Sequence, residues 1–260
     1  MTGLYFSGTG NTRYCAELLT RALDPAARCI AMETAEAARA IGGDDTFVVA
    51  YPVYFSNLPK LVRDFLEQHA AEFRGKRVFL LATMGLFSGD GTGCGARILR
   101  AAGAEITGGL HVKMPDCIGD EKALKKPLDQ NRALVAQARR KLEAAATRIK
   151  KGDAPQEGLS FWAHAAGLLG QRLWFYGKTR HYSGKLKIDK DRCVGCGTCV
   201  SLCPMQNLSL RAGKAVPGGR CTMCYRCVSS CPRQAVTLLG KQVYEQCRIE
   251  RYLPETETKE

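Results

Sequence analysis

The sequence contains one cysteine pattern twice, as CVGCGTCVSLCPMQNLSL at residues 193–210 and CTMCYRCVSSCPRQAVTL at residues 221–238. The two stretches align with an offset of 28 residues, and their cysteines, a Val-Ser pair, a proline, a glutamine and the final leucine coincide. Such a duplication predicts a small domain with pseudo-twofold symmetry, whose two halves share one core. We expect this domain, of α+β type, to occupy residues 186–240.

Each stretch reads Cys-x2-Cys-x2-Cys-x3-Cys-Pro, a spacing typical of proteins that hold two 4Fe–4S clusters. One tight loop presents three thiolates to a cluster, while the fourth cysteine of the same stretch points to the other cluster. The prolines that follow fix the backbone, and Gly195 and Gly197 let the first loop fold closely. The predicted ligands are therefore Cys193, Cys196 and Cys199 with Cys231 for one cluster, and Cys221, Cys224 and Cys227 with Cys203 for the other.

A zinc site is the alternative, because four thiolates also bind zinc tetrahedrally. Zinc sites favour two separated cysteine pairs, whereas this sequence has two complete four-cysteine runs that each end in proline. The pattern therefore favours iron–sulfur clusters over zinc. At these residues the chain resembles the bacterial two-cluster ferredoxins, over about a fifth of its length.

The composition fits a metalloprotein of a reducing compartment. The chain has 260 residues with 45% hydrophobic and 24% charged residues, enough for one α/β domain beside a smaller module. No stretch reaches the ~18 to 20 apolar residues of a membrane-spanning helix, so we expect a cytoplasmic protein without a removable signal. Eight of the 13 cysteines belong to the two motifs, and we interpret the other five as small buried thiols: Cys15, Cys29, Cys94, Cys117 and Cys247.

Residues 1–152 alternate between segments typical of strands and segments typical of helices. This order predicts a doubly wound, five-stranded parallel sheet with a flavodoxin-like strand order. The predicted strands are 3–6, 28–31, 46–51, 78–83 and 107–113, and the predicted helices are 12–23, 58–72, 93–102 and 130–150.

The stretch LYFSGTGNT at residues 4–12 is a strand that enters a loop rich in glycine and hydroxyl groups, followed by a helix start. Backbone N–H groups and the helix dipole at such a position favour an anion, and Ser7, Thr9 and Thr12 add hydroxyl donors. A Walker A motif would need Gly-Lys-Ser/Thr, and a dinucleotide fingerprint would need glycine where Arg13 stands. The loop therefore predicts a phosphate site of another kind.

This loop resembles the FMN phosphate loop of flavodoxins, whose Ser/Thr-x-Thr-Gly-x-Thr pattern is matched from Ser7 to Thr12. The resemblance implies two further loops around the flavin ring, at residues 51–59 and 83–91, each after a predicted strand. It implies these FMN-binding residues: Ser7, Gly8, Thr9, Gly10, Asn11, Thr12, Pro52, Val53, Tyr54, Phe55, Thr83, Met84, Gly85, Phe87 and Gly89.

Alternatives remain for these loops. A glycine-rich turn between a strand and a helix often binds nothing, although the hydroxyl pattern and the two further loops favour FMN. Tyr54, Phe55 and Phe87 either stack on the flavin or pack within their loops. The sequence indicates no catalytic residue.

Residues 153–185 form an aromatic and basic connector, in which Trp162, Trp174 and Phe175 alternate with lysines and arginines. Three interpretations are open. The aromatic side chains pack the two domains together, or the segment docks an acidic redox partner or an anionic membrane surface, or it binds nucleic acid. The first is favoured, and no base-reading motif supports the last. We interpret His164 and His181 as packing or surface residues.

The order of these parts, with a C-terminal tail at residues 241–260, resembles the flavodoxin–ferredoxin fusion proteins of bacteria and archaea. The resemblance includes Met114-Pro115 and Tyr252-Leu253-Pro254. It implies an electron-transfer protein that passes electrons between FMN, two 4Fe–4S clusters and a redox protein partner. Two alternatives are an FMN-dependent reductase of a quinone, nitro compound or nicotinamide, and a cluster-bearing regulatory or scaffold protein without FMN.

Overall fold

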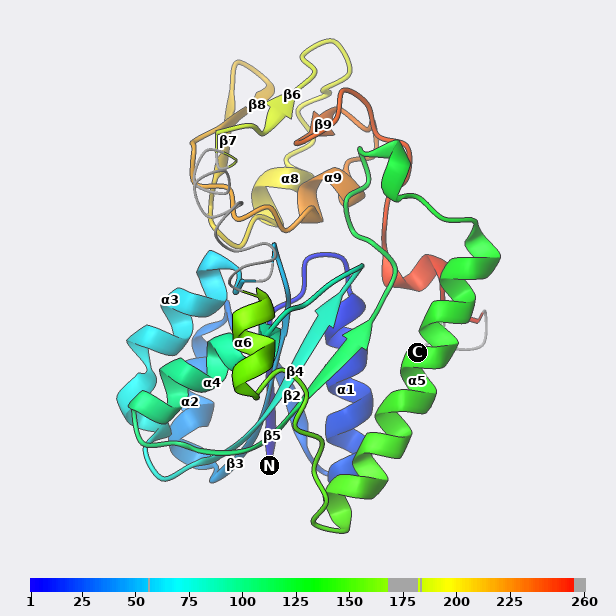
Figure 1. The fold of residues 1–260 in the computed structure, drawn as a ribbon. Coiled ribbons are helices and arrows are strands. Elements are labelled where there is room, and N and C mark those ends of the chain that lie inside the picture. The colour runs from blue at the N-terminus through cyan, green and yellow to red at the C-terminus, as the bar shows by residue number, and fades with distance from the viewer. Residues whose placement is uncertain (56, 168–181, 183, 255–260) are drawn as a thin grey trace.

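The computed structural model describes residues 1–55, 57–167, 182 and 184–254. It has an N-terminal domain, built from β1 (Thr2–Tyr5) to α5 (Leu128–Lys150), and a smaller C-terminal domain, built from β6 (Lys187–Ile188) to β9 (Val236–Thr237). Figure 1 shows the C-terminal domain above the ends of the β4 and β5 arrows. In an open α/β sheet this is the edge at which ligands bind.

The N-terminal domain contains a five-stranded sheet in which every pair of neighbouring strands is parallel. Its strand order is β2-β1-β3-β4-β5, which is the predicted flavodoxin-like order. The strands are β1 (Thr2–Tyr5), β2 (Arg28–Ala31), β3 (Thr46–Pro52), β4 (Arg77–Met84) and β5 (Glu105–Lys113). The fold prediction is thus confirmed, with strand ends that differ by one or two residues.

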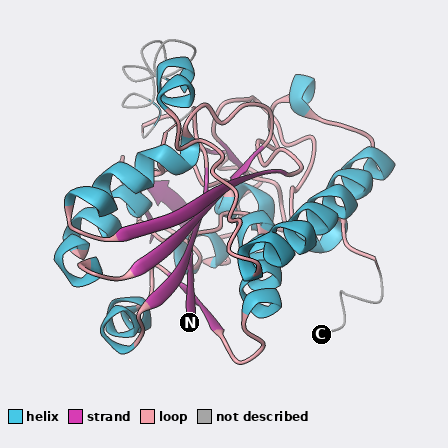
Figure 2. Cartoon of the chain, turned by 60° about the horizontal axis from the view of Figure 1, so that its bottom comes forward, coloured by secondary structure: helices cyan, strands magenta, loops and turns pink. Residues whose placement is uncertain are grey.

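Helices cover both faces of this sheet (Figure 2). α1 (Asn11–Leu23) and α5 (Leu128–Lys150) pack on one face. α2 (Ala35–Gly43), α3 (Lys60–Gln68) and α4 (Gly91–Ala101) pack on the other. The sequence-based assignment missed α2, which is short and alanine-rich, although three of its residues form a buried stripe at helical spacing: Ala37, Ala40 and Ile41.

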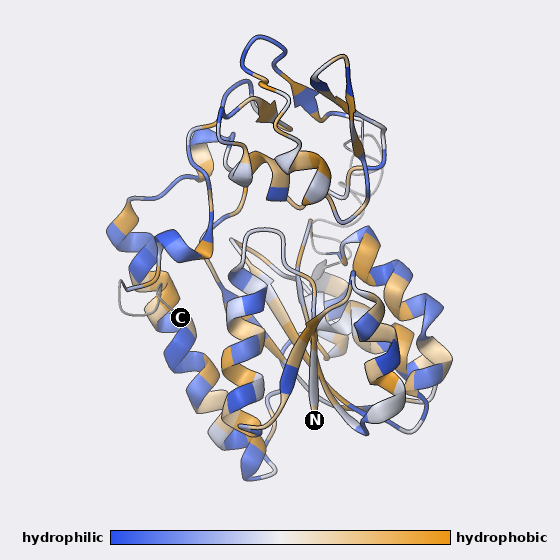
Figure 3. Ribbon diagram, turned by 180° about the vertical axis from the view of Figure 1, so that it is seen from behind, coloured by the Kyte–Doolittle hydropathy of each residue, from blue (hydrophilic) through white to orange (hydrophobic). Residues whose placement is uncertain are grey.

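The core follows the two-residue period of the strands. In β3, Phe47 and Val49 belong to the core below α2 to α4, whereas Val48 and Ala50 belong to the core below α1 and α5. All four are fully buried, as expected for a parallel sheet covered on both faces. In Figure 3 the strands are mostly hydrophobic, and hydrophilic residues lie along the outer sides of the helices.

The predicted helix at residues 58–72 is shorter in the structure. α3 begins after Pro59, whose ring fixes φ but offers no N–H, and ends at Gln68. A separate 3-10 helix, Ala70–Phe73, follows and buries Phe73 against Phe47, with ring centroids 5.5 Å apart. The polypeptide therefore turns once more before it enters β4.

The C-terminal domain has the expected duplicated arrangement. β6 (Lys187–Ile188) pairs with β9 (Val236–Thr237), and β7 (Leu208–Arg211) pairs with β8 (Lys214–Pro217), both antiparallel. Each cysteine motif contributes a short helix, α8 (Thr198–Ser201) or α9 (Arg226–Ser230), and the two helices contact each other. Val228 and Val236 are buried in the core that they share.

Two segments tie the domains together. The connection between β5 and α5 rises to the C-terminal domain, and the tail after β9 descends to α1 and α5 (Figure 1). Asp120 in the first segment is buried, and its Oδ2 accepts hydrogen bonds from the N–H groups of Leu238 and Leu239 at 2.5 and 3.0 Å. In the tail, Ile249 N–H donates to the carbonyl of Thr9, and Tyr252 packs into the core below α1.

Only the two ends of the predicted connector belong to the described residues. α6 (Phe161–Gly167) exposes 73% of Phe161 and 79% of Trp162, so this aromatic pair does not pack between the domains. The described residues do not include Trp174, Phe175 or His181, so the packing of the domains by these side chains stays a prediction. Within the part of the chain that the structure describes, no helix has the length and apolar composition needed to cross a bilayer.

The Asp120 contact predicts a measurable contribution to domain docking. Asp120→Ala removes a buried carboxylate and leaves two interdomain N–H donors unpaired, so we expect a loss of ~1.5–3 kcal/mol in the free energy of unfolding. Guanidinium denaturation of the anaerobically purified full chain, followed by visible absorption and circular dichroism, measures it. Asp45→Ala is the matched control, because this carboxylate is 92% exposed, and an equal loss in both variants would contradict the prediction.

Candidate functional site

A cavity of about 270 Å³ lies between the carboxyl ends of the strands and the C-terminal domain. The three predicted FMN loops come together around it. Of the fifteen predicted binding residues, all line the cavity except Gly10 and Gly89. Gly10 instead faces the tail, where a Cβ would overlap with Ile249, and Gly89 forms a turn with φ of +54°.

The first loop has the structure of a phosphate site. Gly10 precedes α1, and no acidic side chain occupies the first turn of this 13-residue helix. The Oγ of Ser7 accepts a hydrogen bond from Gly10 N–H at 3.1 Å, which closes the loop, and Thr12 and Thr83 share a hydrogen bond of 2.7 Å between their hydroxyl groups. The free N–H groups in the first turn of α1, where the helix dipole is positive, therefore lie at the cavity wall.

One polar atom at this wall has no protein partner. Asn11 Nδ2 donates to the carbonyl of Pro115 at 2.8 Å, while Asn11 Oδ1 is buried without a hydrogen bond. A ligand that carries hydroxyl donors next to a phosphate, as the ribityl chain of FMN does, would satisfy this acceptor. The polar groups of the first loop therefore fit FMN.

The three aromatic residues differ in their surroundings. Tyr54 packs against the core of the N-terminal domain, and burial raises its pKa well above the ordinary value. Phe55 has a positive φ of 52° and places its ring 5.8 Å from that of Tyr182. Phe87 is 45% exposed at the cavity rim. All three line the cavity, so both stacking and loop packing stay open for them.

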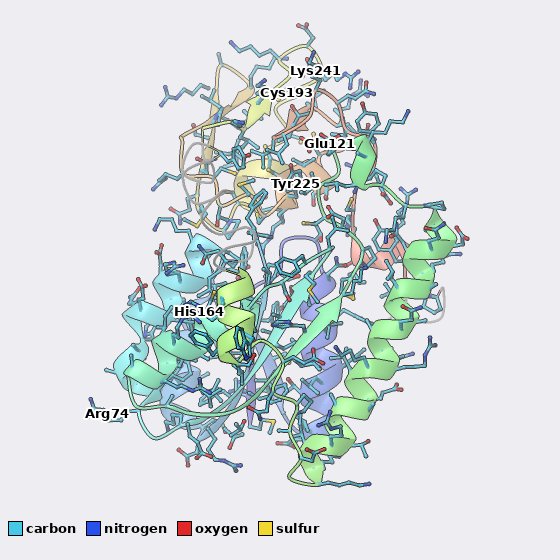
Figure 4. The ribbon with its side chains drawn as sticks, viewed as in Figure 1. Arg74, Glu121, His164, Cys193, Tyr225 and Lys241 are labelled. Carbon is cyan, nitrogen blue, oxygen red and sulfur yellow. The ribbon has the colours of Figure 1, made fainter. Side chains whose placement is uncertain are left out.

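Two polar clusters, around Ser88 and Asp90, hold the third loop at residues 83–91 in place. Ser88 Oγ lies 2.7 Å from His111 Nδ1, and burial lowers the pKa of this histidine. Asp90 is fully buried, and its Oδ2 lies 2.6 Å from Arg97 Nη1 and 2.8 Å from His164 Nδ1. The helix α6 therefore contacts the loop through His164 (Figure 4). His164 thus lies at the surface, with 38% of its side chain exposed, and makes a polar contact to the buried Asp90. These clusters fix the loop that would cover one side of a flavin.

Several cavity residues were missing from the prediction. Apart from Leu86 in the loop after β4, they belong to the connection after β5 and to the second cysteine motif. The Met114-Pro115 dipeptide was the only sequence signal for the first group, and the second group belongs to a distant part of the chain. The additional lining residues are Leu86, Met114, Pro115, Asp116, Cys117, Ile118, Leu124, Met223 and Tyr225.

The eight motif cysteines surround two further cavities. One is lined by Cys203, Cys221, Cys224 and Cys227, and the other by Cys193, Cys196, Cys199 and Cys231. Each cavity thus takes three cysteines from one motif and the fourth from the other, which is the predicted crossed arrangement. Among the described residues, no three His, Cys, Asp or Glu side chains converge tightly enough to hold a single metal ion.

The donor chemistry of both cavities fits iron–sulfur clusters. Backbone N–H groups point at several sulfur atoms, including Asn207 to Cys203 and Ala235 to Cys231, both at 3.2 Å. Such hydrogen bonds stabilise cluster-bound thiolates and tune their reduction potential. Burial raises the pKa of Cys224 to about 12, so a positively charged metal core is needed to keep this thiol deprotonated at neutral pH.

The two cysteine loops reach the same backbone conformation with different residues. Gly195 and Gly197 have positive φ angles of 68° and 77° in the first loop. Their counterparts in the second loop are Met223 and Tyr225, with φ angles of 60° and 59°. This left-handed conformation costs a residue with a Cβ about 1–2 kcal/mol, so both side chains are retained at a cost in local stability. Both line the FMN cavity.

The phosphate loop and the second cysteine loop touch through their backbones. Gly8 lies so close to Cys224 that a Cβ there would overlap with the carbonyl oxygen of Cys224. Next to this contact, Arg226 Nη2 donates to the carbonyl of Ser7 at 2.7 Å and to Glu33 Oε1 at 2.6 Å. A side chain at position 8 would separate a cluster ligand from the FMN loop.

The phosphate loop gives a prediction about affinity. The full chain should bind FMN more tightly than riboflavin, and Thr9→Val should weaken FMN binding by the ~1.5–3 kcal/mol typical of hydrogen bonds to charged groups. The same variant should leave riboflavin affinity unchanged, because riboflavin lacks the phosphate. Fluorescence titration of the flavin-free chain with both ligands measures this, and equal affinities for the two flavins would contradict the phosphate site.

The crossed cavities give a prediction about the clusters. Cys203→Ala and Cys231→Ala change the fourth cysteine of the first and second motif, respectively. We expect Cys203→Ala to alter the cluster bound by Cys221, Cys224 and Cys227, and Cys231→Ala to alter the other one. Electron paramagnetic resonance of the reduced proteins distinguishes the two signals. Loss of the same signal in both variants, or of the signal from the mutated motif itself, would show that ligation is not crossed.

Comparisons with known proteins agree with both sites. The protein-family model described as "Flavodoxin domain" matches residues 4–93, and the one described as "4Fe-4S dicluster domain" matches residues 185–232. Over 30 residues the chain is 53% identical to Ferredoxin-2 of Desulfomicrobium norvegicum, which covers 12% of this chain and 51% of that protein. The chain thus spans about half the length of this relative. Over 20 residues it is 65% identical to a ferredoxin of Pyrococcus woesei, which covers 8% of this chain and 95% of that protein.

Among solved structures, the solution structure of two-electron reduced Megasphaera elsdenii flavodoxin is similar with a TM-score of 0.41 and 24% identity. This match covers 56% of the present chain and 99% of the flavodoxin. The two family matches coincide with the domains that carry the FMN loops and the cysteine motifs. The chain therefore combines a flavodoxin domain with a 4Fe–4S dicluster ferredoxin domain, which is the domain composition of the flavodoxin–ferredoxin fusion proteins.

Proposed function

We propose that this chain passes electrons between FMN and two 4Fe–4S clusters within one molecule, and exchanges them with an external redox protein. The observation that carries the proposal is the position of Tyr225, whose side chain lines both the FMN cavity and the cavity of Cys203, Cys221, Cys224 and Cys227. Tyr225 thus lies between the two cofactor sites.

FMN exchanges electrons singly or in pairs, whereas an iron–sulfur cluster exchanges them one at a time. The protein contributes position and surroundings. Gly8 allows close contact with Cys224, and Arg226 holds the two loops together through Ser7 and Glu33. These contacts fix the FMN loop and the second cysteine loop as one unit.

The surroundings of this unit exclude water. Tyr225 is 2% exposed, Met223 is 8% exposed and Cys224 is 7% exposed. A dry, rigid site lowers the solvent reorganisation that accompanies a change of charge. The arrangement therefore supports transfer between the two sites better than separate domains that meet by diffusion.

The test is the concentration dependence of internal transfer. Anaerobically purified protein should contain one FMN and about eight iron and eight sulfide per chain. After flash photoreduction of its flavin, the absorption of the clusters should change at a rate that does not depend on protein concentration, because both sites belong to one molecule.

A rate proportional to protein concentration would contradict internal transfer. Flavin that is reoxidised by a quinone, a nitro compound or a nicotinamide while the clusters stay oxidised would indicate a direct reductase instead. Protein that carries clusters but binds no FMN would indicate a regulatory or scaffold role.

A further inference from the structure

The two halves of the ferredoxin domain share one pattern but face different surroundings. Cys196 is exposed, whereas its counterpart Cys224 is 7% exposed. Leu210 is 45% exposed, whereas its counterpart Leu238 is 3% exposed. Among the described residues, the flavodoxin domain and its β5–α5 connection cover the second half at Cys224 and Leu238 and leave the first half open at Cys196 and Leu210. The first cysteine of each motif shows the reverse, since Cys193 is buried and Cys221 half-buried. Figure 4 shows Tyr225 on the side that faces the sheet, and Cys193 toward the far side.

The residues that line the cavities follow the same division. Tyr225 and Met223, which stand where the first loop has glycines, reach from the second cysteine loop into the FMN cavity. A positive φ at a non-glycine residue costs backbone energy, so the presence of Met223 and Tyr225 here indicates that their side-chain contacts serve the site. Among the described residues, the cavity of Cys193, Cys196, Cys199 and Cys231 shares no lining residue with the FMN cavity.

The open half also carries an exposed apolar patch beside its cysteines. Val194 is 61% exposed and Leu210 is 45% exposed, and both line the cavity that contains the exposed Cys196. Exposed apolar residues beside a redox centre are suited to close docking, because a partner that covers them brings its own redox centre near.

Positive charge surrounds this patch. Arg233 lines the cavity and is exposed, and Arg211 follows Leu210 and is exposed as well. Arg192 is exposed too and pairs with Asp189 at 3.5 Å, and Lys190 and Asp191 beside it are also exposed, so these segments carry four cations and two carboxylates. The excess of cations at the rim favours a partner with an acidic surface and disfavours a basic one.

We propose that the ferredoxin domain is an ordered relay. The cluster site of Cys203, Cys221, Cys224 and Cys227 exchanges electrons with the flavin across Tyr225 and Met223. The site of Cys193, Cys196, Cys199 and Cys231 exchanges them with an acidic one-electron carrier protein that docks on Val194 and Leu210. This inference rests on the proposed function, and adds the order of the sites and the docking surface.

The electrons balance in single steps. Each passage takes one electron from reduced flavin, through the covered cysteine site and then the open one, to one acceptor molecule, which is reduced by one electron. Two passages with the release of two protons to solvent return the flavin to its oxidised state. The reverse direction uses the same order with a one-electron donor.

The variants Cys203→Ala and Cys231→Ala test the order in the full, FMN-loaded chain. After flash photoreduction, Cys231→Ala should still pass an electron from the flavin to the remaining cluster, and should lose transfer to the external acceptor Co(EDTA)⁻. Cys203→Ala should keep its open cluster and lose transfer from the flavin to it. The opposite pattern overturns the order but leaves the proposed function standing, whereas no internal transfer in the unmodified protein overturns the proposed function itself.

Variants that keep all eight cysteines test the order without the risk of misfolding. Tyr225→Gly introduces the residue that the first loop has at this position, so the backbone conformation is preserved while the side chain is lost. We expect a shifted visible absorption spectrum of bound FMN and slower flavin-to-cluster transfer, and Tyr225→Phe should restore both. A Tyr225→Gly protein with an unchanged spectrum and rate would overturn the role of this residue.

Charge reversal tests the docking surface. Arg233→Glu should slow reduction of anionic Co(EDTA)⁻ by about two- to five-fold, as expected for exposed charges, and should accelerate that of hexaamminecobalt(III). Arg74→Glu changes the net charge equally, at the opposite end of the molecule, and should change neither rate (Figure 4). Equal effects of the two variants would overturn the docking surface. Binding to phosphatidylserine vesicles that Arg233→Glu abolishes would show that a membrane, not an acidic protein, is the partner.

Discussion

The close approach of Gly8 to the carbonyl oxygen of Cys224 is the constraint on which the rest of the structure depends. It joins the phosphate loop of one domain to the cluster loop of the other with no side chain between them. Because Arg226 then reaches both Ser7 and Glu33, the contact is held from the side as well. The distance between the two kinds of site is thereby set by backbone packing, and not by the flexible side chains that usually line domain interfaces.

This constraint explains why a duplicated domain has lost its symmetry. An isolated ferredoxin-like repeat would favour glycine in both left-handed positions of each loop, and the first loop has it. The second loop faces the FMN cavity, where a glycine would leave a void beside the flavin. Met223 and Tyr225 fill this space, and the dry packing around them offsets the cost of their backbone conformation.

Local patterns explain which parts the sequence could predict. The cysteine spacing predicted the two crossed groups of cysteines that line the two cavities, and the order of strand and helix patterns predicted the flavodoxin-like sheet. The sequence could not reveal Tyr225 as a wall of the FMN cavity, because it is more than 200 residues away from the phosphate loop in the chain. The same applies to Asp120, whose carboxylate pairs with N–H groups of the other domain, and to Gly10, which contacts Ile249 of the tail.

The interlocked connections show why this unit cannot be described as two domains on a linker. The β5–α5 connection enters the ferredoxin domain at Asp120, and Gly240 of that domain approaches the Asp120 backbone closely. The tail returns the chain to the phosphate loop, where Ile249 N–H donates to Thr9. Within the described residues, the β5–α5 connection and the tail both cross this interface, and together they restrict its rotation far more than a single tether does. Among the described residues, this interface covers Cys224 and Leu238 of the ferredoxin domain and leaves their counterparts Cys196 and Leu210 exposed.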